Sequence, residues 1–165
     1  MPQHMTGPLG AIPAPTALQG AMVLSALSGG APRANLEQIV IEAWDLPTPA
    51  DLRSALADLV LRHPALHLRA GLAPDGLPQW HLAPPAPPEL ELCDWPEAGD
   101  ARLDQWLEGD RARGCDLRIA PWRAMLAQRG TLPPVLVLTL HHAIIDLPAM
   151  AILLEDLFDL LANQP

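Results

Sequence analysis

The chain has 165 residues, half of them apolar, which is enough for one domain with a buried core. Its formal net charge is −9 and it contains no lysine. It therefore lacks the basic surface that nucleic-acid binding requires, and we expect no nucleic-acid partner. The longest apolar stretch, Leu132 to Leu140, is too short to span a bilayer, so we also expect no association with a membrane.

The cysteines and the N-terminal segment suggest where the protein works. Cys93 and Cys115 lack the spacing of zinc ligands or redox pairs, and the N-terminal residues lack the basic and apolar regions of a signal peptide. Both features favour a cytoplasmic protein. Residues 1–12 carry Pro and Gly without periodicity and predict a flexible lead-in, whereas residues 13–165 form one unit.

Three elements are predicted in the first part of the chain. Residues 16–27 indicate a short helix, and Leu36 to Trp44, rich in β-branched and aromatic residues, predict a strand. A longer helix follows, because Thr48 can cap its start and Pro49 suits its first position. Pro64 ends it. Its apolar stripe comprises Leu52, Ala55, Leu56, Leu59 and Val60.

The remaining elements alternate between strands and helices. A turn at residues 74–76 predicts a hairpin, and the proline-rich residues 83–92 end as a possible strand. A helix is expected before Gly114, then strands over 122–128 and 135–140 joined by RGTLPP. Strands interleaved with helices predict an α/β domain with a mixed β-sheet flanked by helices. The last helix presents Met150, Leu153, Leu154, Leu157, Phe158 and Leu161 on one side.

The segment LTLHHAIIDLPAM, residues 138–150, places two histidines at the end of the central strand and Asp146 in the following turn. A core strand carries titratable groups when they are hydrogen-bonded or used in chemistry. Adjacent residues of a strand point to opposite sides, so His141 and His142 should face different surroundings. The simple alternative is that both are hydrogen-bonded polar residues at a sheet edge.

The chemistry open to this segment is limited. His142 and Asp146 supply at most two ligands, so we expect no metal site. A Ser-His-Asp hydrolase is also disfavoured, because no G-x-S-x-G elbow occurs. What remains is a histidine base whose ring a neighbouring group orients, with the aspartate holding the loop.

Several segments together resemble one family. HHAIIDL resembles an HHxxxDG motif, and Arg62, His63 and Leu66 match an RHxxLR segment. Residues 110–126 are similar to RGFDL…APLLRxxL, and residues 17–27 with NLEQ resemble the opening helix and first strand. The family is the condensation domain of nonribosomal peptide synthetases, with the chloramphenicol acetyltransferase-like fold. The resemblance extends from about Pro13 to the last residue.

The resemblance implies an acyltransferase that joins a carrier-bound acyl or peptidyl thioester to a carrier-bound amine. The complete domain has two lobes facing each other across a tunnel, and this chain resembles the N-terminal lobe. His142 would be the catalytic base or positioning group, His141 a scaffold residue, and Asp146 a structural residue paired with Arg62. No cofactor would bind directly, because phosphopantetheine on carrier proteins holds the substrates. Partners would be carrier proteins and either a C-terminal lobe or a second copy, and we expect no activity without the second lobe.

Two departures from the family pattern leave other functions open. Leu147 replaces the glycine after the aspartate, and His67 replaces an arginine. Either change could tune the site or mark a lobe that has lost activity. The alternatives are a non-catalytic module that docks a carrier or partner, a lobe of an epimerisation domain, and an ester-forming acyltransferase. Candidates for a carrier-binding patch are Arg111, Arg113 and Arg118, which equally suit a solvated helix end.

Overall fold

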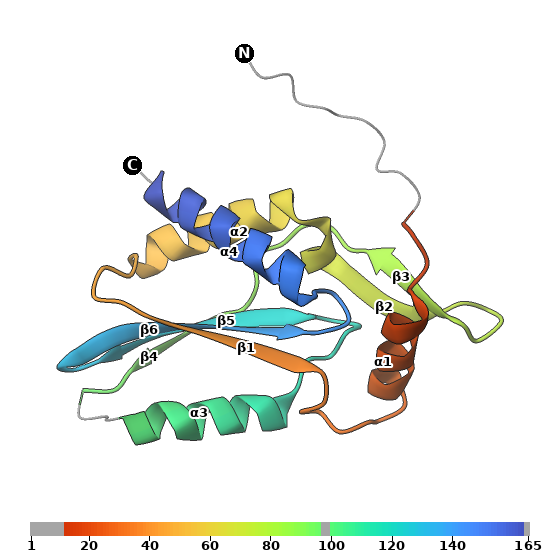
Figure 1. Cartoon of the computed structure of the whole chain (residues 1–165), viewed down its shortest axis with the longest axis horizontal. Coiled ribbons are helices and arrows are strands. Elements are labelled where there is room, and N and C mark those ends of the chain that lie inside the picture. Colours follow the sequence, from red (N-terminus) through yellow and green to blue (C-terminus); the bar gives the residue numbers. More distant parts are fainter. Residues whose placement is uncertain (1–11, 97–99, 164–165) are drawn as a thin grey trace, which may run out of the picture.

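The computed structural model describes residues 12–96 and 100–163, so residues 1–11 of the predicted lead-in lie outside the described part. Figure 1 traces the elements in chain order. The helices are α1 (Ala17–Leu27), α2 (Pro49–Arg62), α3 (Asp100–Arg113) and α4 (Leu147–Ala162), with a 3-10 helix at Pro64–His67. The strands are β1 (Leu36–Glu42), β2 (Leu68–Leu72), β3 (Pro78–Leu82), β4 (Leu90–Asp94), β5 (Trp122–Arg129) and β6 (Leu132–His141).

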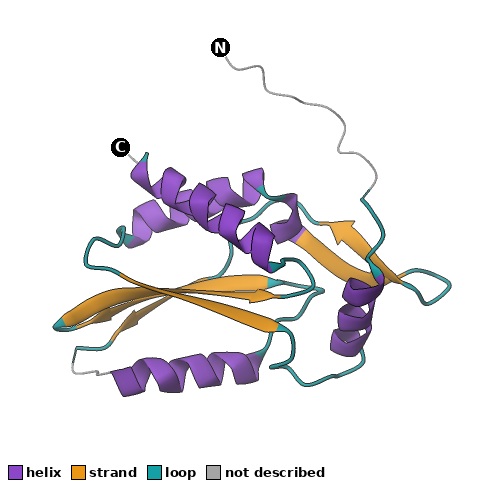
Figure 2. Ribbon diagram, viewed as in Figure 1, coloured by secondary structure: helices purple, strands orange, loops and turns teal. Residues whose placement is uncertain are grey.

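A four-stranded sheet in the order β1-β6-β5-β4 forms the centre of the molecule. Its pairs are antiparallel except for β4 with β5, which run parallel, so the sheet is mixed. Helices α2 and α4 pack together over one face and α3 covers the other (Figure 2). Strands β2 and β3 form a separate antiparallel pair beside α1. The predicted mixed sheet flanked by helices is confirmed.

Strand β6 lies at the centre because both of its faces are covered. Leu136, Leu138 and Leu140 belong to the larger core beneath α2 and α4, whereas Val135 and Val137 belong to the smaller core above α3. A strand buried on both faces reads as a continuous apolar run, which is what residues 135–140 show. The predicted central strand is confirmed.

Helix α2 forms where its start signals predict. Thr48 accepts a hydrogen bond from the backbone N–H of Asp51, and Pro49 occupies the first turn. All five residues of the predicted apolar stripe are buried. The helix ends at Arg62, and the following Pro64 begins the 3-10 turn that sequence analysis did not predict.

Two details differ from the predictions. Strand β6 begins at Leu132, so Pro133 and Pro134 lie inside it and not in the connection. They are tolerated because the regular pairing with β1 begins at Val135 and the pairing with β5 is irregular between Ala127 and Arg129, so no donor of a regular ladder is lost. In α4, Phe158 is exposed and Leu160 is buried. One residue further along the helix than Leu157, the side chain of Phe158 points away from the sheet.

Both cysteines are free thiols. Among residues 12–96 and 100–163, no helix is both long and apolar enough to cross a membrane.

Candidate functional site

The end of β6 carries the histidine pair, and three distant segments hold it in place. The N–H of His141 donates to the carbonyl of Pro121, and the N–H of His142 donates to the carbonyl of Asn35 at 2.7 Å. The side-chain amide of Gln19 donates to the carbonyl of Ala143 at 3.0 Å. The backbone around the pair is therefore fixed from α1, from the residue before β1 and from the residue before β5.

His142 lies partly exposed beside one carboxylate. Its side chain is 34% exposed, and its Nδ1 atom lies 3.8 Å from Oε1 of Glu37 on β1. Nδ1 itself is buried and has no hydrogen-bond partner among the described residues. The solvent-accessible edge of the ring is therefore the one that carries Nε2, and this nitrogen can reach a molecule outside the chain.

His141 lies in different surroundings, as the alternation of side chains along a strand predicts. It is 3% exposed, and its Nδ1 accepts a hydrogen bond of 3.1 Å from the backbone N–H of Ala143. Burial, and to a smaller extent the neighbouring His142, lower the pKa of His141 to about 4. The ring is therefore neutral near pH 7, with Nδ1 as an acceptor and the proton on Nε2.

Asp146 occupies the turn predicted for it, but its partner differs. Its side chain is exposed and accepts a hydrogen bond of 2.9 Å from the N–H of Ala149, which makes it the N-cap of α4. The expected pairing of Asp146 with Arg62 is wrong, because Nη1 of Arg62 lies 3.2 Å from Oδ1 of Asp156. An exposed carboxylate that caps a helix needs no cation to neutralise it.

The RHxxLR-like segment joins the two helices that cover the sheet. His63 follows Arg62 at the end of α2, and its Nε2 lies 2.7 Å from Oδ2 of Asp156 on α4. Both basic side chains therefore contact the same carboxylate, on the part of α4 distant in sequence from the histidine pair. Sequence analysis missed Asp156 because nothing in a single sequence states that α2 and α4 lie side by side.

The two departures from the family pattern are accommodated without strain. Leu147 is the first residue of α4 and is 75% exposed. Its φ is not in the positive range. The conformational freedom of a glycine is therefore not required at this position. His67 is buried, and its Nδ1 donates to the carbonyl of Ala83 at 2.7 Å, which joins the 3-10 turn to the residue after β3.

Three residues of the site were not predicted. Asn35, the one described non-glycine residue with positive φ, supplies the carbonyl beneath His142. Gln19 and Glu37 reach the loop from α1 and β1. The sequence signal for Gln19 was its place in the capping box of Thr16. This signal explains its contact with Thr16 but not its hydrogen bond to Ala143. Within the described residues, no group of three or more His, Cys, Asp or Glu side chains could hold a metal ion.

The fold is shared with solved structures of low sequence identity. The first condensation domain of the calcium-dependent antibiotic synthetase, in complex with a substrate analogue, matches at 22% identity with a TM-score of 0.77, over 88% of this chain and 38% of that chain. The SgcC5 protein from Streptomyces globisporus matches at 24% and 0.75, over 91% and 36%. The X-domain from teicoplanin biosynthesis matches at 24% and 0.76, over 94% and 34%.

These solved structures are much longer than this chain, which spans little more than a third of each. No curated protein sequence matches it significantly. The family model described as "Condensation domain" matches residues 14–164, almost the whole sequence. The histidine pair, the order of the elements and this match all agree, and the chain belongs to the condensation domain family.

Proposed function

We propose that this chain is the N-terminal lobe of a nonribosomal peptide synthetase condensation domain, and that His142 acts in amide-bond formation between a carrier-bound thioester and a carrier-bound amine. The observation that carries the proposal is the placement of His142. Its ring is one-third exposed at the end of the central strand, and its backbone is hydrogen-bonded to Asn35. A base must combine such access with a fixed position.

The proposed reaction is an acyl transfer. The amine nitrogen attacks the thioester carbonyl, a C–N bond forms, the C–S bond breaks, and the carrier's phosphopantetheine leaves as a thiol. Nε2 of His142 takes a proton from the attacking amine and returns it to the sulfur, so that no net proton is consumed. The Glu37 carboxylate near Nδ1 favours the proton on that nitrogen, which leaves the Nε2 lone pair free.

His141 and Asp146 have structural roles in this proposal. His141 accepts from the backbone of the loop it begins, and Asp146 starts α4 immediately after that loop. Neither side chain is needed to contact the reacting atoms. Phosphopantetheine would enter as part of the carrier-bound substrates, and this lobe would hold no cofactor of its own.

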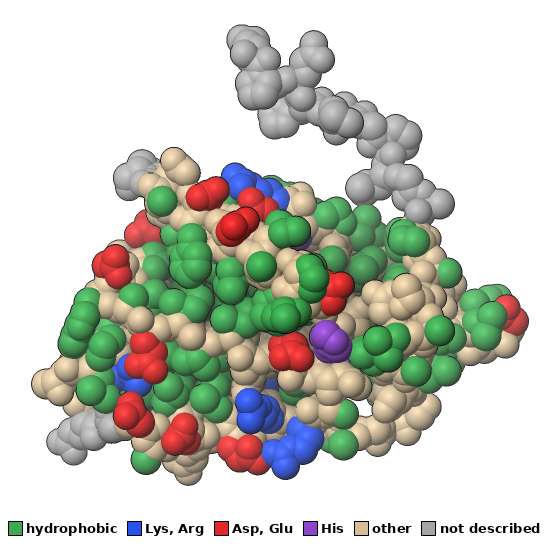
Figure 3. All heavy atoms as spheres, in the orientation of Figure 1, with side chains coloured by type: hydrophobic (Ala, Val, Ile, Leu, Met, Phe, Trp, Pro, Cys, Tyr) green, Lys and Arg blue, Asp and Glu red, His purple; other side chains and the backbone are tan. Residues whose placement is uncertain are grey.

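A second lobe is part of the proposal. The similar solved structures are more than twice as long, and this chain exposes large apolar side chains on β1, just after it, and on α4. Figure 3 shows apolar side chains gathered over the middle of the face where β1 and α4 lie. Such a surface is typical of one that another protein surface covers, and we assign it to a C-terminal lobe. These side chains include Val40, Trp44, Leu147, Ile152 and Phe158.

The test is to measure condensation between loaded carrier proteins, with and without a supplied C-terminal lobe, while recording the molecular mass over a range of protein concentrations. We expect no turnover by the lobe alone, because an open site admits water and loses the positioning of the amine. With the second lobe present, we expect His142→Ala to lower the rate by about 10²–10⁴-fold. A strictly monomeric lobe that condenses substrates at full rate would contradict the proposal.

Measurements on His142→Ala and analysis of the products distinguish the other functions. If His142→Ala binds carrier proteins as the parent does and the synthetase still forms its product, the chain is a non-catalytic docking module. Inversion at the Cα of a carrier-bound aminoacyl group would identify an epimerisation domain, and an ester product with a free alcohol would identify an ester-forming acyltransferase.

A further inference from the structure

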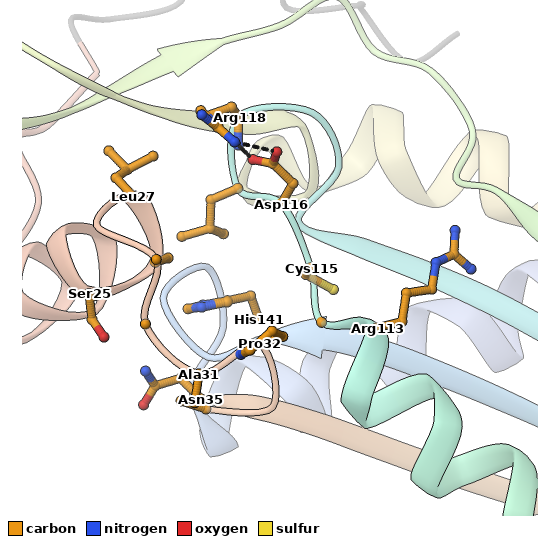
Figure 4. A pocket seen from close by; sticks show the side chains of 16 residues that line it. Ser25, Leu27, Ala31, Pro32, Asn35, Arg113, Cys115, Asp116, Arg118 and His141 are labelled. Carbon is orange, nitrogen blue, oxygen red and sulfur yellow. Dashed lines mark hydrogen bonds and ion pairs between the residues drawn. The ribbon is translucent and has the colours of Figure 1, made fainter.

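A second site lies on the opposite side of the histidine pair from the exposed edge of His142. It is a cavity of about 250 Å³ between the loop after α1 and the loop after α3, and His141 forms part of its wall. Figure 4 shows the imidazole of His141 extending from the end of β6 toward the loop after α1. His142 does not line this cavity. The side chains of the two neighbouring histidines therefore face separate spaces.

The cavity is preformed, because the two loops that line it are in close contact. Gly114 has φ +72°, and a Cβ atom at this position would lie 2.7 Å from the carbonyl oxygen of Pro32. Only a glycine allows this approach, so the loops are held together by backbone packing. Leu117 is almost fully buried, and its carbonyl accepts from the N–H of Ala70, which anchors the second loop to β2.

His141 supplies an unused hydrogen-bond donor to this cavity. Its Nδ1 is occupied by the N–H of Ala143, so in the neutral ring the proton is on Nε2. Nε2 has no hydrogen-bond partner within residues 12–96 and 100–163, and it is not among the buried side-chain atoms without a partner, so this donor is open to the cavity. A donor that opens into a cavity can hydrogen-bond water, and the acceptor atom of a ligand can take the place of that water.

The charges around the cavity indicate an uncharged acceptor. Two arginines line it, but Arg113 lies 2.6 Å from Glu89 and Arg118 lies 2.8 Å from Asp116. Both guanidinium groups are about half exposed or more and already have carboxylate partners, and in Figure 4 Arg113 points away from the cavity. A buried carboxylate ligand would find no free cation, whereas a carbonyl group needs one donor.

We propose that this cavity binds a small uncharged amide whose carbonyl oxygen accepts a hydrogen bond from Nε2 of His141. The walls suit such a ligand because Leu27, Ala31 and Pro32 offer apolar surface beside the donor. Two sources share this chemistry, namely the pantetheine arm, which contains two amides, and the backbone of a short peptide. The proposal does not depend on the role of His142, because the two rings face different spaces.

The experiment is an NMR titration of the whole chain labelled with ¹⁵N, following Nε2–H of His141 and the backbone N–H of Cys115. The probes are pantetheine, N-acetylglycine methylamide and acetate. We expect saturable shifts with at least one amide and a dissociation constant of about 1 mM or below, typical of a ligand of this size. Tighter binding of pantetheine would identify the arm, and tighter binding of the methylamide would identify a peptide. Equal affinity would show that the amide alone is recognised.

Two variants test the cavity itself. Ala31→Trp fills the space while leaving His141 in place, and His141→Phe keeps a ring but removes the donor. We expect both to weaken amide binding at least tenfold. The matched control is Ala151→Trp on an exposed position of α4, which should bind as the parent does. Dispersed spectra check that each variant folds. Absence of a shift with both amides, unchanged affinity in Ala31→Trp, or acetate binding as tightly as the amides would overturn the proposal.

Discussion

Nδ1 of His142 lies 3.8 Å from Oε1 of Glu37, and the two residues belong to neighbouring strands of the central sheet. The carboxylate is 46% exposed, so water screens much of its field. Even so, it is the acidic group found within ion-pair distance of this ring in the described part of the chain. In the proposed reaction this carboxylate favours the tautomer of His142 with the proton on Nδ1.

We expect Glu37→Gln to reduce the population of the tautomer with the proton on Nδ1. The interaction of a half-exposed carboxylate with the N–H of a neutral imidazole should contribute no more than about 0.5–1 kcal/mol, which corresponds to a change of about two- to fivefold in the tautomer ratio. Long-range ¹H–¹⁵N NMR spectra of His142 measure this ratio directly. The matched control is Glu155→Gln on the exposed face of α4. An unchanged ratio in Glu37→Gln would remove Glu37 from the proposed mechanism.

Asp146 should behave as a helix cap. We expect Asp146→Ala to lower the free energy of unfolding by about 1 kcal/mol, because the N–H of Ala149 loses its acceptor. Asp146→Asn should be nearly neutral, since asparagine caps helices as well as aspartate. Urea denaturation followed by circular dichroism measures both. A loss as large in the asparagine variant as in the alanine variant would point to a charged partner instead.

The buried pair of Asp110 and Arg123 should contribute strongly to stability. Nε of Arg123 lies 2.6 Å from Oδ1 of Asp110, and the two side chains are 9% and 2% exposed, respectively. Thr139 and Gln38 donate to Oδ2 of the same carboxylate, so the pair connects α3 to β5, β6 and β1. We expect Asp110→Ala to lower the free energy of unfolding by about 3–5 kcal/mol, because the guanidinium is left buried without its partner.

The matched control for the buried pair is Glu108→Gln on the same helix. Glu108 pairs with Arg33 at the surface, where the two side chains are 63% and 55% exposed. We expect a loss below about 1 kcal/mol there. Equal losses in Asp110→Ala and Glu108→Gln, measured by urea denaturation, would contradict the importance assigned to burial.

The stability of the protein should depend on pH through His141. The pKa of this ring is lowered from 6.5 to about 4, so in that interval the unfolded chain binds the proton more readily than the folded chain. We therefore expect this contribution to be fully present above pH 6.5 and to be lost as the pH falls from 6.5 to about 4.

The measurement is the midpoint of urea denaturation at a series of pH values, for the parent and for His141→Gln. Since glutamine does not titrate, the variant should show a flatter dependence between pH 6.5 and 4. Identical slopes for the two proteins would show that His141 is not the group responsible.

Local patterns predicted most of the fold. The apolar stripe of α2 and the continuous run of β6 each depend on residues close together in sequence, and both are confirmed. The order of strands and helices was sufficient for the mixed sheet. The prolines of β6 were misassigned because their tolerance depends on where β1 stops pairing, which is a tertiary fact.

The site was predictable in its positions and less so in its partners. The end of the apolar run located His141, and the turn before the last helix located Asp146. The partner assigned to Arg62 was wrong because a single sequence does not state which carboxylate of α4 lies beside the end of α2. Glu37 and Asn35 were missed for the same reason, since β1 reaches the histidines only through its pairing with β6.

The position of β6 in the chain also determines when the protein can fold. This strand lies between β1 and β5, yet it is the last of the described strands along the chain, and the amide of Gln19 contacts a carbonyl 124 residues further along. Contacts of such long sequence separation require closing large loops, which slows folding. On the ribosome, β1 would lack this neighbour until the chain had been extended to His141. During that interval the unpaired backbone groups of β1 are open to wrong pairings.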